Sequence, residues 1–253
     1  MIPIGLQLFS VRGECQKDLP ATIAAAADMG YQGVEPWGYR GEEVAWLGRP
    51  AKELRTILDD SAQRCCGMHL ATDALMGENL SRTIELNQEL GNRFLIIAAD
   101  KPRMSSAEGI AELAGILDAA AERLQPLGMR AGYHAHPFDF ERIGERTAWE
   151  ILFSTVRPDV IMQLDTGNCA RGGADPVAVL ERFPGRSASI HLRDYAGDQT
   201  PILGEGEADW TEIFGLCETT GATEWYVVEQ GGSDGIGLDI PRACLQALKR
   251  MGK

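Results

Sequence analysis

The chain of 253 residues lacks several features that would each assign it to a class of protein. It contains no run of about 20 apolar residues, the length that a membrane-spanning helix needs. Its first residues have neither the charged region nor the long apolar region of a secretory signal peptide. The six cysteines are scattered and form no CxxC pair of the kind that binds zinc. We therefore expect a protein of the reducing cytoplasm that has no membrane partner.

Basic residues are also scarce. The 24 lysines and arginines stand against 37 aspartates and glutamates, so the formal net charge is −13. Nucleic-acid phosphates attract basic clusters, and because none is present we expect no nucleic-acid partner. The turn after the first apolar run, residues 10–14, contains neither a GxGxxG nor a phosphate-binding loop motif, which disfavours dinucleotide- and nucleotide-driven chemistry. We expect a small-molecule partner, and the sequence leaves open whether the chain forms a homo-oligomer.

Eight short apolar runs recur along the chain, and each is bounded by turn residues as a buried parallel strand should be. They are Ile4–Phe9, Gly33–Trp37, Cys65–Leu70, Phe94–Ala99, Met129–His136, Val160–Asp165, Ala188–Leu192 and Trp225–Glu229. Helical stretches lie between them, often with glycine just past the end or proline in the first turn. They are Leu19–Met29, Ala51–Arg64, Leu80–Leu90, Ala107–Leu127, Thr147–Phe153, Pro176–Phe183, Trp210–Thr220 and Pro241–Met251.

This alternation predicts the fold class. Eight strand–helix units of about 32 residues, with no linker between halves, predict an α/β fold of the (β/α)8 TIM-barrel type. We expect a single domain over residues 1–253. A doubly wound open sheet is the competing architecture, and the missing glycine-rich turn after the first strand disfavours it.

Polar residues gather at the predicted carboxyl ends of the strands, which is where TIM barrels carry their active sites. All four histidines of the chain and three carboxylates fall there: His69, His134, His136, His191, Glu35, Asp165 and Glu229. A carboxylate at the end of a buried strand is costly unless it is paired or bound to a cation. Mixed carboxylate and imidazole ligands suit Mn²⁺, Mg²⁺, Co²⁺ or Zn²⁺. The sequence therefore predicts a divalent metal at Asp165, His191 and Glu229.

Seven motifs, in an order and spacing that run nearly end to end, carry a resemblance to a known family. They are GLQLFSVR at 5–12, GVEPW at 33–37, GYHAHPFDF at 132–140, LDTGN at 164–168, HLRD at 191–194, LGEG at 203–206 with DW at 209–210, and VVEQ at 227–230. With these motifs the chain resembles the xylose isomerase-like TIM-barrel superfamily of sugar phosphate isomerases and epimerases. D-tagatose 3-epimerases and inosose dehydratases are among its members.

The resemblance implies one divalent metal, typically Mn²⁺, held by four side chains. Three ligands carry over as Asp165, His191 and Glu229. The fourth does not, because the epimerases place a glutamate at the end of the fifth strand, roughly where His134 stands. A subgroup carries a Tyr-His-Asn-His-x-x-Glu-Phe run, in which this chain has alanine for the asparagine and Asp139 for the glutamate. The fourth ligand is thus Asp139, His134 or His136. The two histidines share one face of a strand because side chains alternate.

The resemblance also implies a reaction. A metal that binds a ketone and a neighbouring hydroxyl acidifies the adjacent C–H, and a base then removes the proton to give an enediolate. We expect Glu229 and either His134 or His136 to carry the protons, since neutral imidazole is suited to this role. Return of the proton gives isomerisation or epimerisation of a sugar, keto-sugar or cyclitol, and loss of a β-hydroxyl gives dehydration instead. Arg193 replaces the family lysine and can hold a carboxylate or phosphate.

The remaining expected substrate contacts are His69 and Glu35 at the strand ends, Glu205 in its glycine-bordered loop, and Trp37, which would form an apolar wall with Phe9. We expect Glu205 to contact substrate hydroxyls or Arg193. Two other readings are a phosphodiesterase similar to apurinic endonucleases and a non-catalytic sugar-binding barrel. The first uses three metals and many more histidines than four. The second does not need its carboxylates and histidines at one site.

Overall fold

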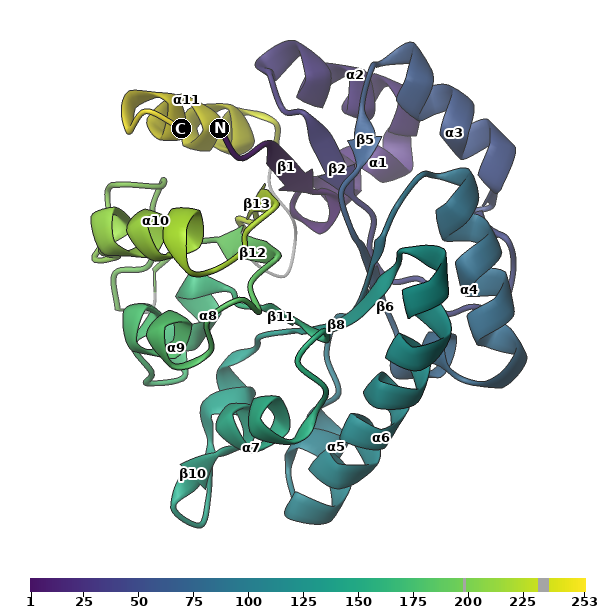
Figure 1. Ribbon diagram of the computed structural model, residues 1–253. Helices are drawn as coiled ribbons and strands as arrows, with labels where there is room; N and C mark the ends of the chain where they lie inside the picture. Colours follow the sequence, from purple (N-terminus) through teal and green to yellow (C-terminus); the bar gives the residue numbers. More distant parts are fainter. Residues whose placement is uncertain (198, 232–236) are drawn as a thin grey trace.

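The structure is a computed structural model that describes residues 1–197, 199–231 and 237–253. Parallel strands form a ring around the central axis, and helices surround the ring (Figure 1). The strands of the ring are β1 (Ile4–Gln7), β2 (Gly33–Glu35), β5 (Arg64–Cys65), β6 (Met68–Leu70), β7 (Phe94–Ile97), β8 (Arg130–His134), β11 (Ile161–Gln163), β12 (Ser189–Leu192) and β13 (Trp225–Val228). All eight predicted strand positions are confirmed, with β5 and β6 as two pieces of the third.

The ring consists of two hydrogen-bonded sheets. One has the order β12-β13-β1-β2-β5, the other β11-β8-β7-β6, and every pair is parallel. A parallel bridge between Asp165 and His191 joins β11 to β12, and another between Tyr39 and Leu70 extends the contact of the second and third positions. The sheets therefore close into the predicted (β/α)8 barrel, and closure brings the candidate residues of different strands to one rim.

The helices follow the predicted order with shifted ends. They are α1 (Arg12–Lys17), α2 (Leu19–Met29), α3 (Ala51–Asp60), α4 (Gly77–Glu89), α5 (Lys101–Met104), α6 (Ala107–Leu124), α7 (Ala148–Thr155), α8 (Thr166–Arg171), α9 (Pro176–Arg182), α10 (Trp210–Thr219) and α11 (Asp239–Arg250). Helix α3 stops before the predicted Arg64 because Ala62 adopts a left-handed conformation (φ 50°) and Arg64 already pairs in β5. The short helices α1, α5 and α8 were not predicted from the sequence.

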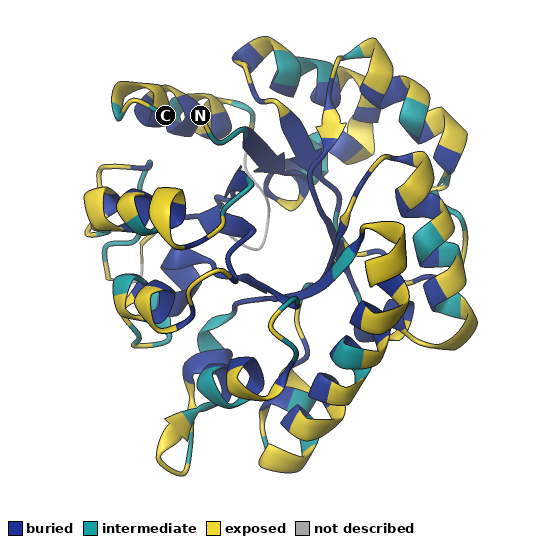
Figure 2. Cartoon of the chain, viewed as in Figure 1, coloured by how far each residue is buried: buried dark blue, intermediate teal, exposed yellow. Residues whose placement is uncertain are grey.

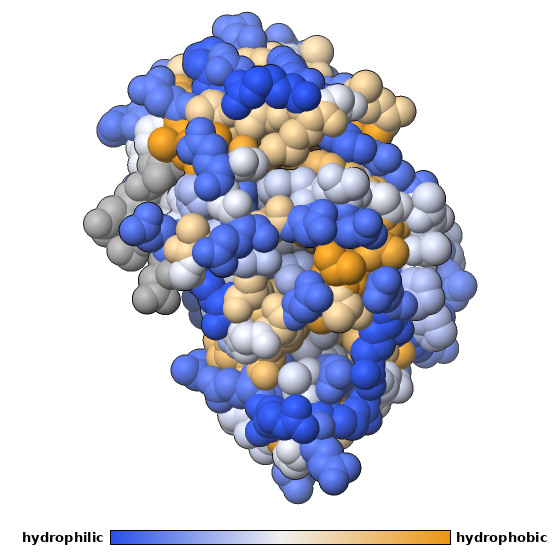
Figure 3. Space-filling model, turned by 90° about the vertical axis from the view of Figure 1, so that its left-hand side faces the viewer, coloured by the Kyte–Doolittle hydropathy of each residue, from blue (hydrophilic) through white to orange (hydrophobic). Residues whose placement is uncertain are grey.

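Smaller elements complete the loops. The described residues include the 3₁₀ helices η1 (Leu8–Val11), η2 (Thr72–Leu75), η3 (Gln125–Leu127) and η4 (Pro137–Phe140). They also include hairpins that pair β3 (Ala45–Trp46) with β4 (Arg49–Pro50) and β9 (Arg142–Ile143) with β10 (Arg146–Thr147). Among the described residues, no helix has both the length and the apolar character needed to cross a bilayer. The face seen in Figure 3 is mainly hydrophilic, with small and separate apolar spots.

Burial follows the barrel plan: the strands are buried, and the helices turn exposed residues outward (Figure 2). Inside the barrel, away from the carboxyl ends of the strands, lies an apolar cluster that consists of Cys66, Phe94, Ile96, Ile161, Ala188, Trp225 and Val227. Glycines on neighbouring strands make room for these side chains, since a Cβ at Gly132 would lie 2.5 Å from Ile96 Cδ1 and 2.8 Å from Ile161 Cβ. The interior beneath the polar rim is thus apolar and closely packed around Gly132.

We predict that Gly132→Ala destabilises the fold by about 1–3 kcal/mol, because the added methyl group overpacks this layer. The matched control is Gly115→Ala on the exposed surface of α6, where no neighbouring heavy atom lies within 4 Å of the added Cβ. That change should stabilise the protein by about 0.5–1 kcal/mol, since alanine is the better helix former. Urea unfolding measures both. Equal stability of wild type and Gly132→Ala would contradict a filled interior.

Candidate active site

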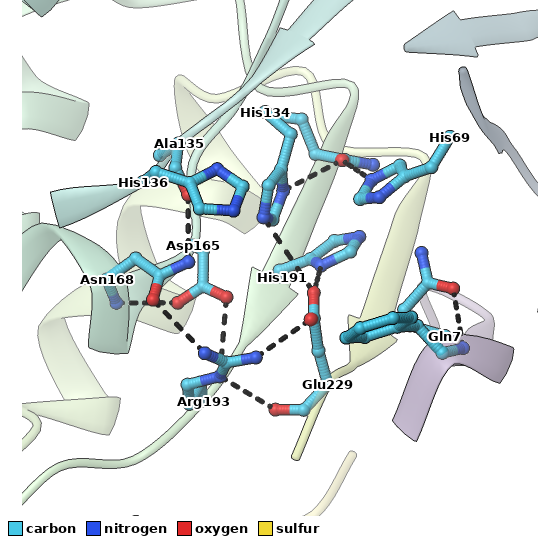
Figure 4. Close-up of polar contacts among 12 residues, drawn as sticks. Gln7, His69, His134, Ala135, His136, Asp165, Asn168, His191, Arg193 and Glu229 are labelled. Atoms are coloured by element: carbon cyan, nitrogen blue, oxygen red, sulfur yellow. Dashed lines mark hydrogen bonds and ion pairs between the residues drawn. The ribbon is translucent and has the colours of Figure 1, made fainter. Parts of the chain in front are cut away.

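Four side chains meet at the carboxyl-end rim of the barrel. His134 ends β8, His191 lies in β12, and Asp165 and Glu229 follow β11 and β13. Each of the four offers a ligand atom within 4.8 Å of the others (Figure 4). All four are buried. A second group of three, which overlaps the first, adds His69 to His134 and His191. The structure therefore brings together the three metal ligands predicted from the sequence and, of the candidates for the fourth, His134.

Asp165 has two functions at the start of α8. Its Oδ1 accepts a hydrogen bond from the backbone N–H of Asn168 at 2.7 Å, so the side chain caps the helix. Its Oδ2 is buried without a hydrogen-bond partner in the described residues, and the nearest cation is Arg193, whose Nε lies 3.5 Å away. Burial raises the pKa of Asp165, and Arg193 opposes the rise. A buried carboxylate oxygen without a hydrogen-bond partner is costly, and a bound cation would remove that cost.

Arg193 lies between the carboxylates of Asp165 and Glu229 (Figure 4). Its Nη2 contacts Glu229 Oε1 at 2.8 Å, and its Nη1 donates to the side-chain oxygen of Asn168 at 3.1 Å. The approach requires Gly167, because a Cβ there would lie 2.7 Å from Arg193 Cγ. Burial alone would raise the pKa of Glu229, but Arg193 and His191 hold it well below its usual range. Glu229 is therefore a carboxylate.

His191 bridges two carboxylates with its two ring nitrogens. Nδ1 lies 2.6 Å from Glu229 Oε2, and Nε2 lies 2.6 Å from Glu35 Oε2. Since a carboxylate can only accept, both nitrogens donate and the ring is an imidazolium. Burial alone would lower the pKa of His191, but Glu35 and Glu229 raise it to about 10. A cation bound between His191 and Glu229 would replace the proton on Nδ1.

His134 is held in the opposite charge state. Its Nδ1 lies 3.1 Å from the side-chain oxygen of Gln163, and its Nε2 lies 3.8 Å from Glu229 Oε2. Burial lowers the pKa of His134 well below its usual range, and the charge on His191 lowers it further. The ring is therefore neutral, with its proton on Nδ1 facing the amide oxygen and a lone pair on Nε2.

The donor set fits a divalent cation. Two carboxylates and two imidazoles present oxygen and nitrogen ligands, a combination that suits Mn²⁺, Co²⁺ or Zn²⁺ and also, through its oxygens, Mg²⁺. The unpartnered Oδ2 of Asp165 and the proton shared by His191 and Glu229 mark where a cation would bind. The candidate ligands are His134, Asp165, His191 and Glu229.

Asp139, another candidate for the fourth ligand, lies away from this group in the part of the chain that the structure describes. Its Oδ1 accepts a hydrogen bond from the Tyr133 hydroxyl at 3.0 Å, and its Oδ2 accepts one from the His136 backbone N–H at 2.7 Å. Burial raises the pKa of Asp139 to about 8. The carboxyl group holds the turn that follows β8.

His136 is the most accessible histidine of the rim. Its ring is partly exposed, stacks on Phe138 at 5.3 Å between centroids and lies 5.1 Å from the ring of His134. Its Nδ1 is buried and has no hydrogen-bond partner within the described ranges. Burial lowers the pKa of His136 to about 4, so the imidazole is neutral and can accept a proton.

The other predicted substrate contacts differ in how far they are buried. Trp37 is half-buried and makes an edge contact with Phe9, at 6.3 Å between ring centroids, so the two rings of the predicted apolar wall lie side by side. Glu205 is exposed on its loop, while Arg193 is engaged by Asp165 and Glu229. Glu35 and His69 are buried next to the metal-ligand candidates, His69 through the amide of Gln163 at 2.7 Å.

Two residues of the site, Gln7 and Gln163, were not among the candidates from the sequence. Gln163 donates to Glu35 Oε1 at 2.9 Å and to Ser189 Oγ at 2.9 Å, and Gln7 donates to Glu35 Oε2 at 2.7 Å. A sequence signal was available, because Gln163 lies two residues before Asp165 on an apolar strand and therefore points to the same interior face. Both glutamines are fully buried.

Comparison with known proteins identifies the family. Residues 23–251 match the family described as xylose isomerase-like TIM barrel. The chain belongs to this family. The inosose dehydratase of Lacticaseibacillus casei is 27% identical over 152 residues, which cover 51% of this chain and 49% of that protein. The chain thus spans about half the length of the inosose dehydratases that it matches.

Solved structures of xylose isomerase-like barrels superpose on nearly the whole chain. A sugar phosphate isomerase/epimerase from Parabacteroides distasonis has a TM-score of 0.83 at 22% identity, and 98% of this chain and 95% of that chain are covered. A D-allulose 3-epimerase from Methylomonas sp. has a TM-score of 0.71 at 14% identity, with 98% and 97% covered. At these identities the likeness establishes the shared fold.

We predict that Asp139→Asn leaves metal binding intact, because the asparagine oxygen can still accept from the His136 backbone N–H and its NH₂ group can donate to the Tyr133 hydroxyl oxygen, so the turn stays bonded. The pKa of Asp139 is raised from an unfolded value of about 3.9 to about 8. Its protonated form therefore favours folding below about pH 4, and this contribution is lost as the pH rises through about 8. The variant should lose less stability than wild type over that interval in urea unfolding. Loss of bound metal in Asp139→Asn, by elemental analysis, would return Asp139 to the ligand set.

Proposed function

We propose that the protein is a divalent-metal-dependent isomerase or epimerase that acts on a sugar, keto-sugar or cyclitol by removing a proton next to a carbonyl group. The observation that carries the proposal is the buried set of His134, Asp165, His191 and Glu229 with the unpartnered Oδ2 of Asp165. Mn²⁺ is the metal that we propose, with Mg²⁺, Co²⁺ and Zn²⁺ as substitutes. Held by these residues, the ion would supply Lewis acidity next to the carbonyl group.

We propose that His136 and Glu229 transfer the protons. His136 is a neutral, half-buried imidazole at the edge of the site, so we propose it as the base that takes the proton from carbon. Glu229 is ionised between Arg193 and His191 before substrate binds, so we propose it as the second group that would take a proton from substrate. Return of the proton to the opposite face gives an epimer, and return to the neighbouring carbon gives an isomer.

Arg193 and the aromatic pair set the surroundings of the substrate. Because Arg193 is buried and already pairs with two carboxylates, its role in this proposal is to hold Asp165 and Glu229 in place. Phe9 and Trp37 offer an apolar surface to one face of a sugar ring. We also propose the cytoplasm as the location, supported by six cysteines that are all buried free thiols.

Dehydration is the second candidate reaction. It is favoured by the similarity to inosose dehydratases over 152 residues. It starts with the same proton abstraction, after which a β-hydroxyl leaves as water instead of the proton returning. The same base and the same metal ligands serve both outcomes, so the substrate decides between them.

The test is proton exchange with solvent. Inosose and a panel of 2-keto and 3-keto sugars are incubated with the Mn²⁺-loaded protein in D₂O and followed by NMR. We expect deuterium at the carbon next to the carbonyl with metal and none after chelation. An additional signal of an unsaturated product would identify dehydration. Metal-independent turnover would contradict the proposal, and absence of any exchange or turnover across the panel would favour a non-catalytic sugar-binding barrel.

The base is tested in the same assay. His136→Asn should slow exchange by roughly a hundredfold or more, the usual contribution of a general base. Phe138→Leu is the matched control, because it removes the ring stacked on His136 and leaves the imidazole in place. We expect the control to keep most of the exchange rate. Equal rates in wild type and His136→Asn would assign the proton transfer to Glu229 or His134.

A further inference from the structure

One carboxylate next to the metal-ligand candidates, that of Glu35, is completely buried. It ends β2, its exposed fraction is 0%, and its hydrogen bonds come from three directions. Gln7 Nε2 and His191 Nε2 donate to Oε2 at 2.7 and 2.6 Å, and Gln163 Nε2 donates to Oε1 at 2.9 Å. A carboxylate so completely enclosed by donors has a structural partner for each oxygen and no oxygen left for a substrate.

The contact with His191 determines which ring nitrogen faces the metal-ligand candidates. Since a carboxylate only accepts, Nε2 of His191 must carry the proton toward Glu35. The other nitrogen, Nδ1, then faces Glu229 Oε2 at 2.6 Å, on the side where Asp165 also lies. Ligating histidines are commonly oriented in this way, by a carboxylate that binds the nitrogen on the far side of the ring.

The hydrogen bond between Glu35 and Gln163 also determines which nitrogen of a second histidine, His134, carries the proton. Because Glu35 accepts from the amide nitrogen of Gln163, the amide oxygen points the other way. That oxygen accepts from His69 Nε2 at 2.7 Å and from His134 Nδ1 at 3.1 Å. The proton of His134 is thereby fixed on Nδ1, and its lone pair is on Nε2, toward Glu229.

We infer that Glu35 is a positioning residue that sets the tautomers of two metal-binding histidines, directly for His191 and through the amide of Gln163 for His134. The inference rests on the proposed metal site and adds to it the ligand atoms, Nδ1 of His191 and Nε2 of His134. Glu35 touches neither the metal nor the substrate in this assignment. Its polarity decides the direction of every hydrogen bond in the chain of contacts from β2 to β8.

The same hydrogen bonds predict how Glu35→Gln would change the tautomer of His134. A glutamine has one oxygen and one NH₂ group, and it meets three donors. If the Gln163 amide turns over to accept from the new NH₂ group, its own nitrogen faces His134 Nδ1. His134 then has to accept at Nδ1 and carry its proton on Nε2, where it can no longer bind a metal. Loss of such an orienting carboxylate typically weakens metal affinity by about ten- to a hundredfold.

The primary experiment uses the intact wild-type protein, loaded with diamagnetic Zn²⁺ and labelled with ¹⁵N in its histidine rings. The chain has four histidines, so the spectrum is simple enough to assign each ring. We expect His191 to be ligated through Nδ1 with a proton on Nε2, and His134 to be ligated through Nε2 with a proton on Nδ1. Ligation of His191 through Nε2 would overturn the inference, whereas a wild-type protein that binds no Zn²⁺ would overturn both the inference and the proposed function.

The second experiment compares Zn²⁺ dissociation constants, measured by competition with a chelator. Glu35→Gln should bind Zn²⁺ about ten- to a hundredfold more weakly and show the reversed His134 tautomer. The matched control is Asp100→Asn, which alters another buried carboxylate that bonds Thr72 and Arg103 and contacts no histidine. We expect the control to keep wild-type affinity and tautomers, with thermal unfolding recorded for each variant. Weakened affinity in Glu35→Gln with unchanged tautomers would show an effect of charge alone and overturn the inference.

Discussion

The burial of charge at the carboxyl-end rim is the constraint on which the rest of the site depends. Three carboxylates, those of Glu35, Asp165 and Glu229, are buried there, and two cations, His191 and Arg193, are buried with them. Removing a carboxylate from water is costly unless hydrogen bonds and opposite charges replace the water. Negative groups outnumber positive ones, and one oxygen of Asp165 has no hydrogen-bond partner in the described residues. The arrangement is therefore suited to a further cation.

The fold makes this concentration of charge possible. Closure of the barrel places the ends of β8, β11, β12 and β13 side by side, so residues up to 95 positions apart in the sequence share one site. Below the rim the interior is apolar, and glycines such as Gly132 let large side chains fill it. This apolar surrounding has a low dielectric constant, which strengthens the electrostatic contacts next to it.

Much of the fold, and the residues that meet at the rim, could be predicted from the sequence, since apolar runs and the polar residues that end them are both local signals. The roles of individual residues were harder to predict. Asp139 has a carboxyl group, as a metal ligand needs, but it lies in η4, where that group accepts a hydrogen bond from the His136 backbone and holds the turn. Gln163 is uncharged, so only its position two residues before Asp165 on the same strand marks it in the sequence. The direction of its amide follows from Glu35, 128 positions earlier, and only the folded chain brings the two together.

Occupancy of the rim by one divalent ion, with Asp165 Oδ2 as a ligand, is most directly tested by measuring Mn²⁺ bound to wild type and to Asp165→Asn. Asparagine keeps an oxygen to cap α8 at Asn168 and replaces the unpartnered carboxylate oxygen by an uncharged NH₂ group. Equilibrium dialysis followed by elemental analysis should give one ion per wild-type chain and none in the folded variant at the same free Mn²⁺. Equal occupancy of the two proteins, or no metal in either, would contradict the account.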